Sequence, residues 1–116
     1  MFDFEKLIVY SKAKDQYESS IKILKENPAI EKNLQHQLKR ASSSVILNIA
    51  EGSGRFSKAD KRYFYIMARG SVYECVAILD LLREEKLVNS YQFERNYSSL
   101  EELSKMLLAL INFQTK

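Results

Sequence analysis

The sequence contains very few residues that interrupt a helix. Only three glycines and one proline occur in 116 residues, whereas a β-rich fold needs a turn about every 8–12 residues. Long helices are therefore expected and strands are not. The length suits one domain covering residues 1–116, and a hydrophobic content of 46% is enough for a modest core.

Apolar residues recur at alternating spacings of three and four in four segments, as in helices that pack in a bundle. The segments are expected at about residues 4–24, 31–51, 58–85 and from 90 to near the C-terminus. Their short links favour antiparallel neighbours, and hence an all-α, antiparallel up-down-up-down four-helix bundle. The core rows predicted for the four helices are, in order, Leu7, Tyr10, Lys14, Tyr17, Ile21 and Leu24; Leu34, Leu38, Ala41, Val45 and Asn48; Phe64, Ala68, Ser71, Cys75, Ile78 and Leu82; and Phe93, Tyr97, Leu100, Leu103, Leu107 and Ile111.

The links between the segments carry helix-cap signals. Gly52 or Gly54 is predicted to take the left-handed conformation that closes many helices. Ser57, with Asp60 three residues later, is a predicted N-cap, as is Asn89 or the serine after it. The GSG fragment lacks the strand and the further residues of a phosphate-binding loop. A tight link between two helices is therefore favoured over a phosphate cradle.

The counts of cysteine and histidine argue against several classes of functional site. Cys75 is the single cysteine and is expected to be a small buried apolar residue. One histidine, His36, cannot supply the paired Glu-x-x-His motifs of a di-metal bundle. We therefore expect no metal and no cofactor. No nucleophile with a base is apparent, so we expect no enzymatic activity, and no small-molecule substrate is evident, although a pocket for a lipid or small molecule inside the bundle is conceivable. The uncharged runs are too short to cross a bilayer and the N-terminus is unlike a signal peptide, which predicts a cytoplasmic protein without membrane contact.

Positive charge is concentrated in the middle of the chain. Residues 36–69 include seven basic and two acidic residues, a local charge of +5, whereas the whole chain carries +3. At about 100° per residue, Lys58, Arg62 and Arg69 fall within about 40° of each other, with Tyr65 about 40° to one side. Cations beside aromatic rings are typical of sites for single-stranded or looped RNA. The alternative is a solvated helix face whose tyrosines pack on a neighbour.

The third segment carries more apolar surface than one core row needs. Ile66, Val76 and Ala77 lie away from the predicted core row. A second apolar face on a bundle helix usually contacts another chain. Self-association is therefore expected, and the alternative is a broad core within the monomer.

Polar residues lie close to the core rows of the second and third segments. Buried polar groups cost free energy unless they are hydrogen-bonded, so these residues are expected to bond across the helix pair. A role in fixing the register of the two helices is favoured over acid–base catalysis by Glu51 and Glu74. The predicted structural network is Asn48, Glu51, Ser71 and Glu74, with Gln37 and Ser44 on the same flank.

Three phrases carry a family resemblance: FEKLIVYSKAK, QLKRASSSVILNIAEGSGR and ARGSVYE. The chain resembles the four-helix bundle proteins encoded in intervening sequences of bacterial 23S rRNA genes. Members of that family typically show Gln-Leu-Arg-Arg-Ala, Asn-Ile-Ala-Glu-Gly and Gly-Ser-x-x-Glu, which correspond here to residues 37–41, 48–52 and 70–74. Lys39 stands where the family commonly has arginine, which keeps the charge but loses the planar fork.

The resemblance implies a homopentameric, barrel-like ring that binds nucleic acid and has no enzymatic activity. The chain is also similar to the accessory variability protein of diversity-generating retroelements, which works with a reverse transcriptase and RNA. We therefore expect a sequence-tolerant RNA or DNA binder, and the alternative is a scaffold that recruits another protein. Three predicted nucleic-acid contacts come from positions that match the family, and four from the helical wheel: Lys39, Arg40 and Arg55, and Lys58, Arg62, Tyr65 and Arg69.

Overall fold

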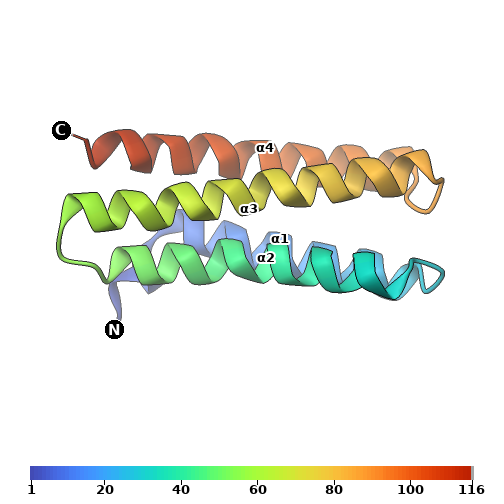
Figure 1. Cartoon of the computed structure of the whole chain (residues 1–116), viewed down its shortest axis with the longest axis horizontal. Helices are drawn as coiled ribbons and strands as arrows, with labels where there is room; N and C mark the ends of the chain where they lie inside the picture. The colour runs from blue at the N-terminus through green and yellow to red at the C-terminus, as the bar shows by residue number, and fades with distance from the viewer. Residues whose placement is uncertain (116) are drawn as a thin grey trace.

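The computed structural model describes residues 1–115 as four long helices preceded by a short 3-10 helix (Figure 1). The predicted four-helix organisation is confirmed, and the first helix starts later than expected because Leu7 is extended. Lys116, the last residue of the predicted domain, lies outside the described residues. The elements are η1 (Asp3–Lys6), α1 (Ile8–Glu26), α2 (Lys32–Ser53), α3 (Lys58–Glu84) and α4 (Ser90–Phe113).

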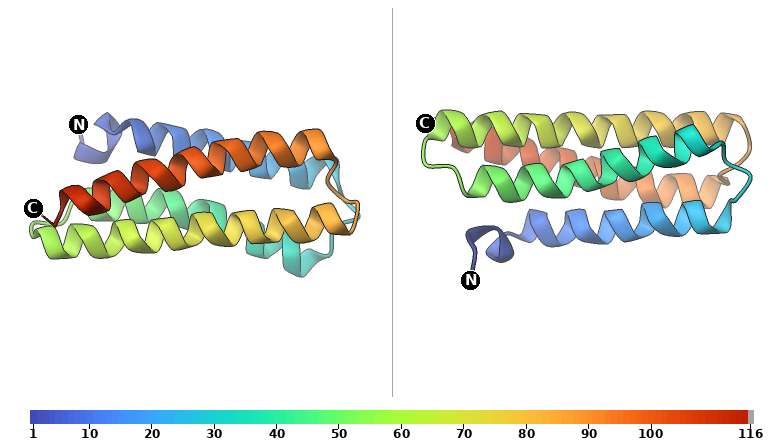
Figure 2. Two further views of the ribbon diagram at one scale, coloured as in Figure 1. Left: turned by 90° about the horizontal axis from the view of Figure 1, so that it is seen from above. Right: turned by 60° about the horizontal axis from the view of Figure 1, so that its bottom comes forward.

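Successive helices run in opposite directions and pack in the order of the sequence (Figures 1 and 2). The α1–α2 and α3–α4 links lie at one end of the bundle. The α2–α3 link lies at the other end, beside both ends of the described chain. Because α4 also packs on α1, the helices stand at the corners of a square, with α1 diagonal to α3 and α2 diagonal to α4.

The core contains leucines of α2, α3 and α4 together with isoleucine, valine and alanine side chains, and most of the predicted positions of these helices belong to it. Five predicted core positions differ: Tyr97 is 40% exposed, and the other four are half-buried, namely Leu34, Asn48, Phe64 and Ser71. The core leucines Leu38, Leu79, Leu82, Leu100, Leu103 and Leu107 are each at most 1% exposed.

The buried row of α1 is displaced from the predicted one. Lys14 is exposed, and Tyr10 and Tyr17 are only half-buried. The row that is actually buried contains two polar residues and one alanine. The apolar spacing therefore predicted a row on the adjacent side of the helix. The residues that α1 buries are Val9, Ala13, Gln16, Ser20 and Ile23.

Gly52 lets α2 and α3 approach closely near their link. A Cβ atom at this buried position would lie 2.9 Å from Cε1 of Tyr65, which is shorter than a carbon–carbon contact allows. The prediction of a left-handed glycine cap is wrong, because Gly52 is helical and Gly54 has a φ of −90°. The amide of Gly54 instead donates to the carbonyl of Glu51 at 3.2 Å, which closes a tight turn.

The other helix ends follow the predicted cap chemistry. The Ser57 hydroxyl accepts a hydrogen bond from the amide of Asp60 at 3.0 Å. The Asn89 side chain accepts one from the amide of Gln92 at 2.8 Å. Lys86, just after α3, has a φ of 62°, so the left-handed conformation that the sequence suggested for a glycine is adopted by a lysine at a different helix end.

Candidate nucleic-acid interface

The α2–α3 link gathers basic residues around an exposed phenylalanine. We call Arg55, Phe56, Lys58 and Arg62 the loop cluster. All four are exposed, and Phe56 has a relative exposure of 103%. Lys58 and Arg62 are four residues apart at the start of α3 and therefore lie on one face of that helix. The cluster thus places three cations and one solvated ring at one end of the bundle.

Contacts on both sides of the link hold the loop cluster in place. The Lys61 ammonium donates to the Ser53 carbonyl at 2.8 Å, which ties the first turn of α3 to the end of α2. The Arg55 guanidinium lies 4.6 Å from the centroid of the Phe64 ring and 3.7 Å from a Glu51 carboxylate oxygen. The backbone is therefore fixed while the tip of the link faces solvent.

Lys39 and Arg40 lie away from the loop cluster. Both belong to α2, roughly 20 Å along the helix axis from its C-terminal end. Lys39 lines the groove between α1 and α2, whereas the Arg40 guanidinium is 3.1 Å from the Glu74 carboxylate on α3. Adjacent helical residues point about 100° apart, so this pair divides between two neighbouring helices. The predicted contacts consequently do not form one patch.

Tyr65 is not placed to stack on bases, contrary to the prediction from the sequence. Its side chain is 3% exposed, and burial raises the pKa of its phenol. The ring packs close to Gly52 in the interior. The prediction that Tyr65 contacts nucleic acid is therefore wrong for this chain conformation.

Arg69 fastens α3 to α4. Its Nε atom donates to the Ser104 carbonyl at 3.1 Å, and a terminal nitrogen donates to the Tyr73 hydroxyl at 3.2 Å. A helical wheel places a side chain relative to its own helix and says nothing about the neighbouring one. That is why the wheel grouped Arg69 with Lys58 and Arg62, although its guanidinium is engaged with α4.

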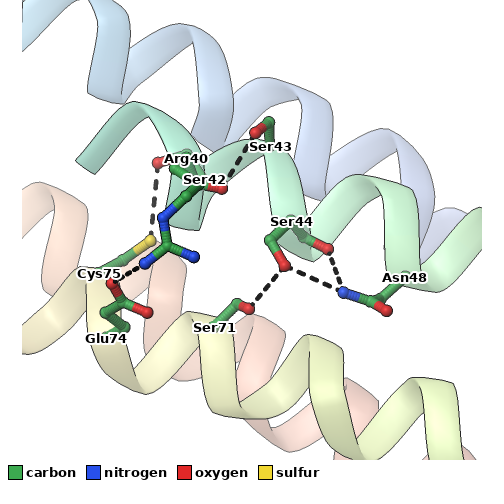
Figure 3. A network of polar contacts seen from close by, with 8 residues as sticks. All are labelled: Arg40, Ser42, Ser43, Ser44, Asn48, Ser71, Glu74 and Cys75. Atoms are coloured by element: carbon green, nitrogen blue, oxygen red, sulfur yellow. Dashed lines mark hydrogen bonds and ion pairs between the residues drawn. The ribbon is translucent and has the colours of Figure 1, made fainter. Parts of the chain in front are cut away.

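The predicted polar network between α2 and α3 is present in part (Figure 3). The Ser71 hydroxyl donates to the Ser44 hydroxyl at 2.9 Å, and the Asn48 amide donates to the same oxygen at 3.0 Å. Three side chains thus link the two helices at one level. Because Asn48 and Ser71 lie where the predicted core rows of α2 and α3 face each other, the network fits a role in fixing register.

Two carboxylates of the predicted network have other partners. Glu74 pairs with Arg40 across the two helices (Figure 3), so it contributes to the α2–α3 contact separately from the serines. Glu51 is exposed and pairs with Arg55 one turn later, so it is not part of the network. Within residues 1–115, no three His, Cys, Asp or Glu side chains are grouped to hold a metal ion.

Cys75 is buried beside the network, as expected. It is 0% exposed, and its sulfur lies 3.6 Å from the Ser42 hydroxyl (Figure 3). Burial raises the pKa of the thiol to about 11. The thiol therefore stays protonated at neutral pH, where a thiolate would be needed for nucleophilic chemistry.

A second buried polar contact joins α1 to α4 and was not predicted. The Gln16 side-chain amide donates to Oδ1 of Asn96 at 2.9 Å and to the Ser20 hydroxyl at 3.3 Å. Its Oε1 atom is buried without a hydrogen-bond partner among the described residues. The signal that could have revealed the contact is Asn96 itself, which lies between Phe93 and Leu100 in the buried row of α4.

The outward side of α3 carries a second row of uncharged residues. We call Ala59, Tyr63, Ile66, Gly70, Tyr73 and Ala77 the outer stripe; all are exposed and alternate at spacings of four and three. A Cβ atom at Gly70 would have no neighbour within 4 Å among the described residues. Packing within the chain therefore does not require a glycine there. Val76, predicted to share this face, instead packs partly against the core.

The outer stripe adjoins a groove between α3 and α4. The groove has a volume of about 630 Å³, and its lining includes Tyr73 and Ala77 of the stripe. Apolar side chains such as Val76, Phe93 and Tyr97 contribute to the same lining. Its charged residues are three carboxylates, Asp80, Glu94 and Glu101, and one cation, Arg83, which lies 2.7 Å from Asp80.

Fold and surface together define a class: an all-α protein of four sequentially packed helices with a basic helix link. Residues 5–109 match the 23S rRNA-intervening sequence protein family, and the chain belongs to that family. The resemblance inferred from the sequence motifs is thereby confirmed.

A solved structure supports the same fold. It is the crystal structure of a protein of unknown function from the S23 ribosomal protein family of Bacteroides thetaiotaomicron. The two chains have a TM-score of 0.83 and 22% sequence identity, over 90% of this chain and 98% of the other. No curated protein matches the sequence. Within residues 1–115, no helix is long and apolar enough to cross a membrane.

Proposed function

We propose that this chain is a non-catalytic subunit of a homo-oligomeric ring that binds RNA or DNA through its phosphates. The observation that carries the proposal is the loop cluster, in which Arg55, Lys58 and Arg62 are exposed on a well-braced link. Lysine and arginine side chains that neutralise phosphates release counterions from the nucleic acid. Such contacts position a protein on the backbone without reading the bases. Binding should therefore be tolerant of sequence and sensitive to salt.

Charge reversal in the loop cluster tests the binding proposal. Fluorescence anisotropy would follow a labelled structured RNA and a DNA duplex from about 50 to about 200 mM salt. Each subunit should contact about three phosphates. The slope of the logarithm of the binding constant against the logarithm of the salt concentration should then be about −2 to −3 for each bound subunit. The variant Lys58→Glu/Arg62→Glu should bind roughly 100-fold more weakly at low salt, because two attractions become repulsions.

A matched control distinguishes the effect of the loop cluster from the effect of changing the net charge. Lys22→Glu/Lys32→Glu changes the charge by the same amount, at two exposed lysines outside the α1–α2 groove. They lie toward the end of α1 and at the start of α2, at the end of the bundle away from the α2–α3 link (Figure 1). The affinity of this control should stay within a few-fold of wild type. Equal losses in both pairs, or a flat salt response, would contradict the loop cluster as the site. Circular dichroism melting curves should show that both pairs remain folded.

The outer stripe of α3 supports the oligomeric part of the proposal. Its spacing of four and three is the spacing of a helix that packs along another helix. Glycine inside a helix costs about 1 kcal/mol relative to alanine, and Gly70 lies where this chain leaves open space. A small residue is useful there if another backbone approaches closely.

Two opposite faces of the bundle further support a ring. Cyclic rings need a heterologous contact, in which one surface meets a different surface of the next subunit. The α3–α4 groove is lined by three carboxylates and by Arg83, which pairs with Asp80, so its lining is negative on balance. The α1–α2 groove is lined by Lys25, His36 and Lys39, so its lining is positive. These grooves lie on opposite sides of the square of helices, so their charges favour head-to-tail contact. Multi-angle light scattering of five 13.5 kDa chains would give a mass of about 68 kDa for the homopentamer that the resemblance implies.

Substitution of Gly70 should act in opposite directions on the monomer and the assembly. Gly70→Leu replaces glycine with a good helix former and should favour the isolated helix by roughly 1 kcal/mol. The same side chain should obstruct a close helix–helix contact and lower the mass measured by light scattering. Ser98→Leu, on the exposed side of α4, is the control and should leave the mass unchanged. An unchanged mass for Gly70→Leu would remove the outer stripe from the interface.

A second candidate function is a scaffold that recruits another protein, with nucleic acid incidental. The observation that favours it is the apolar α3–α4 groove, which could accept a helix of a partner. Pull-down from nuclease-treated extract discriminates between the two functions. A protein partner that is retained after nuclease treatment, and lost with Val76→Glu in the groove, would favour the scaffold.

A further inference from the structure

The geometry points to Phe56 as a stacking residue for an unpaired base, which makes single-stranded or looped nucleic acid the preferred ligand of the loop cluster. The inference rests on the proposed binding function and deepens it. The basic residues alone would bind any phosphate backbone. A ring that can stack on a base adds a preference that a continuous duplex cannot satisfy, because its bases are already stacked on each other.

The first support is the exposure of the side chain. Phe56 has a relative exposure of 103%, higher than any other large hydrophobic side chain among the described residues. Burying a phenylalanine would stabilise a fold substantially, and this one contributes nothing of that kind to the chain. The link itself is short and closed by the tight turn at Gly54, so its backbone keeps Phe56 at this end of the bundle.

The second support is the chemistry around the ring. Arg55 precedes Phe56, and Lys58 and Arg62 follow it, with Asp60 as the one acidic residue between Arg55 and Arg62. Single-strand sites combine cations that follow the backbone with aromatic rings on which successive bases stack. The Lys61–Ser53 and Ser57–Asp60 hydrogen bonds fix the backbone on the α3 side of Phe56, so little ordering is needed when a base is bound.

Tryptophan substitution gives a direct test, because the chain contains no tryptophan. Phe56→Trp should bind a single-stranded RNA of about 12 nucleotides as tightly as wild type, with quenching of the new fluorescence as the base stacks. A duplex of the same sequence should bind through the phosphates with little quenching. Phe56→Ala should weaken binding of the single strand by about 5- to 100-fold and leave duplex affinity and the salt slope unchanged.

The control is Phe113→Ala, which removes another exposed phenylalanine. Phe113 is the last residue of α4, and that helix ends at the same end of the bundle as the α2–α3 link (Figure 1). This variant should bind both ligands as wild type does. If wild type binds both ligands with a steep salt response and Phe56→Ala binds them equally well, stacking is refuted while the proposed function stands. If wild type binds neither ligand, the proposed function fails and this inference fails with it. Equal losses for single strand and duplex in Phe56→Ala would also overturn the stacking role.

Discussion

Replacing Gly52 with valine is expected to lower the free energy of unfolding by about 3 kcal/mol or more. Even a single Cβ atom at this position would lie 2.9 Å from Cε1 of Tyr65 and 3.0 Å from Cβ of Phe64. The Phe64 atom is bonded to the backbone, so it cannot move away without moving α3. Valine adds two methyl groups to this contact and should force the two helices apart near their link.

Urea unfolding followed by circular dichroism would measure the loss, and Gly54→Val is the matched control. A Cβ atom at Gly54 would lie 3.7 Å from the nearest carbonyl oxygen, an ordinary contact. The backbone there has a φ of −90°, which is outside the left-handed region that favours glycine. The control should cost less than about 1 kcal/mol, as surface substitutions usually do. Equal stability of the two valine variants would show that α2 and α3 are not closely packed at Gly52.

Removing one member of the buried Gln16–Asn96 pair should cost more than removing both. Asn96→Leu keeps a similar volume but deprives the buried Gln16 amide of its acceptor on α4. Leaving a buried polar group unpaired costs about 1–3 kcal/mol, and Gln16 already has one carboxamide oxygen without a partner among the described residues. A loss of about 2–3 kcal/mol is therefore expected for this single variant.

The double variant Gln16→Met/Asn96→Leu replaces both polar groups by apolar ones of similar size. Its loss should be smaller than that of Asn96→Leu, because of this cluster only the Ser20 hydroxyl, which accepts from Gln16 at 3.3 Å, then loses a partner. The four proteins of this cycle, compared by urea unfolding, give the interaction energy of the pair directly. Additive losses in the double variant would mean that the two side chains are not coupled as the structure places them.

The helices could be predicted from the sequence because several local signals agree for α2, α3 and α4. Their apolar rows are rich in leucine, isoleucine and valine, and Ser57 and Asn89 mark two helix starts. The row of α1 was displaced by one flank because the helix buries Gln16 and Ser20 and leaves Tyr10 and Tyr17 half-exposed. Hydrophobic spacing cannot identify a buried row that is partly polar.

The candidate site could be predicted only in part, for a different reason. The helical wheel and the family motifs identified the basic residues. The direction in which each side chain points, however, depends on the neighbouring helices. Arg69 is drawn to a carbonyl of α4, and Arg40 to a carboxylate of α3. Residues beside the α2–α3 link have fewer neighbours, so Lys58 and Arg62 stay exposed as the wheel suggested. Phe56 was not singled out, because a phenylalanine in a sequence does not reveal that nothing covers it.

Both ends of the described chain lie beside the α2–α3 link (Figure 1). Any domain, tag or surface tethered at either end through a short flexible linker would be held near Phe56 at an effective concentration in about the millimolar range. It would then compete with, or assist, whatever the loop cluster binds. A tether at the α1–α2 turn, at the far end of the bundle, would leave the loop cluster free of that influence.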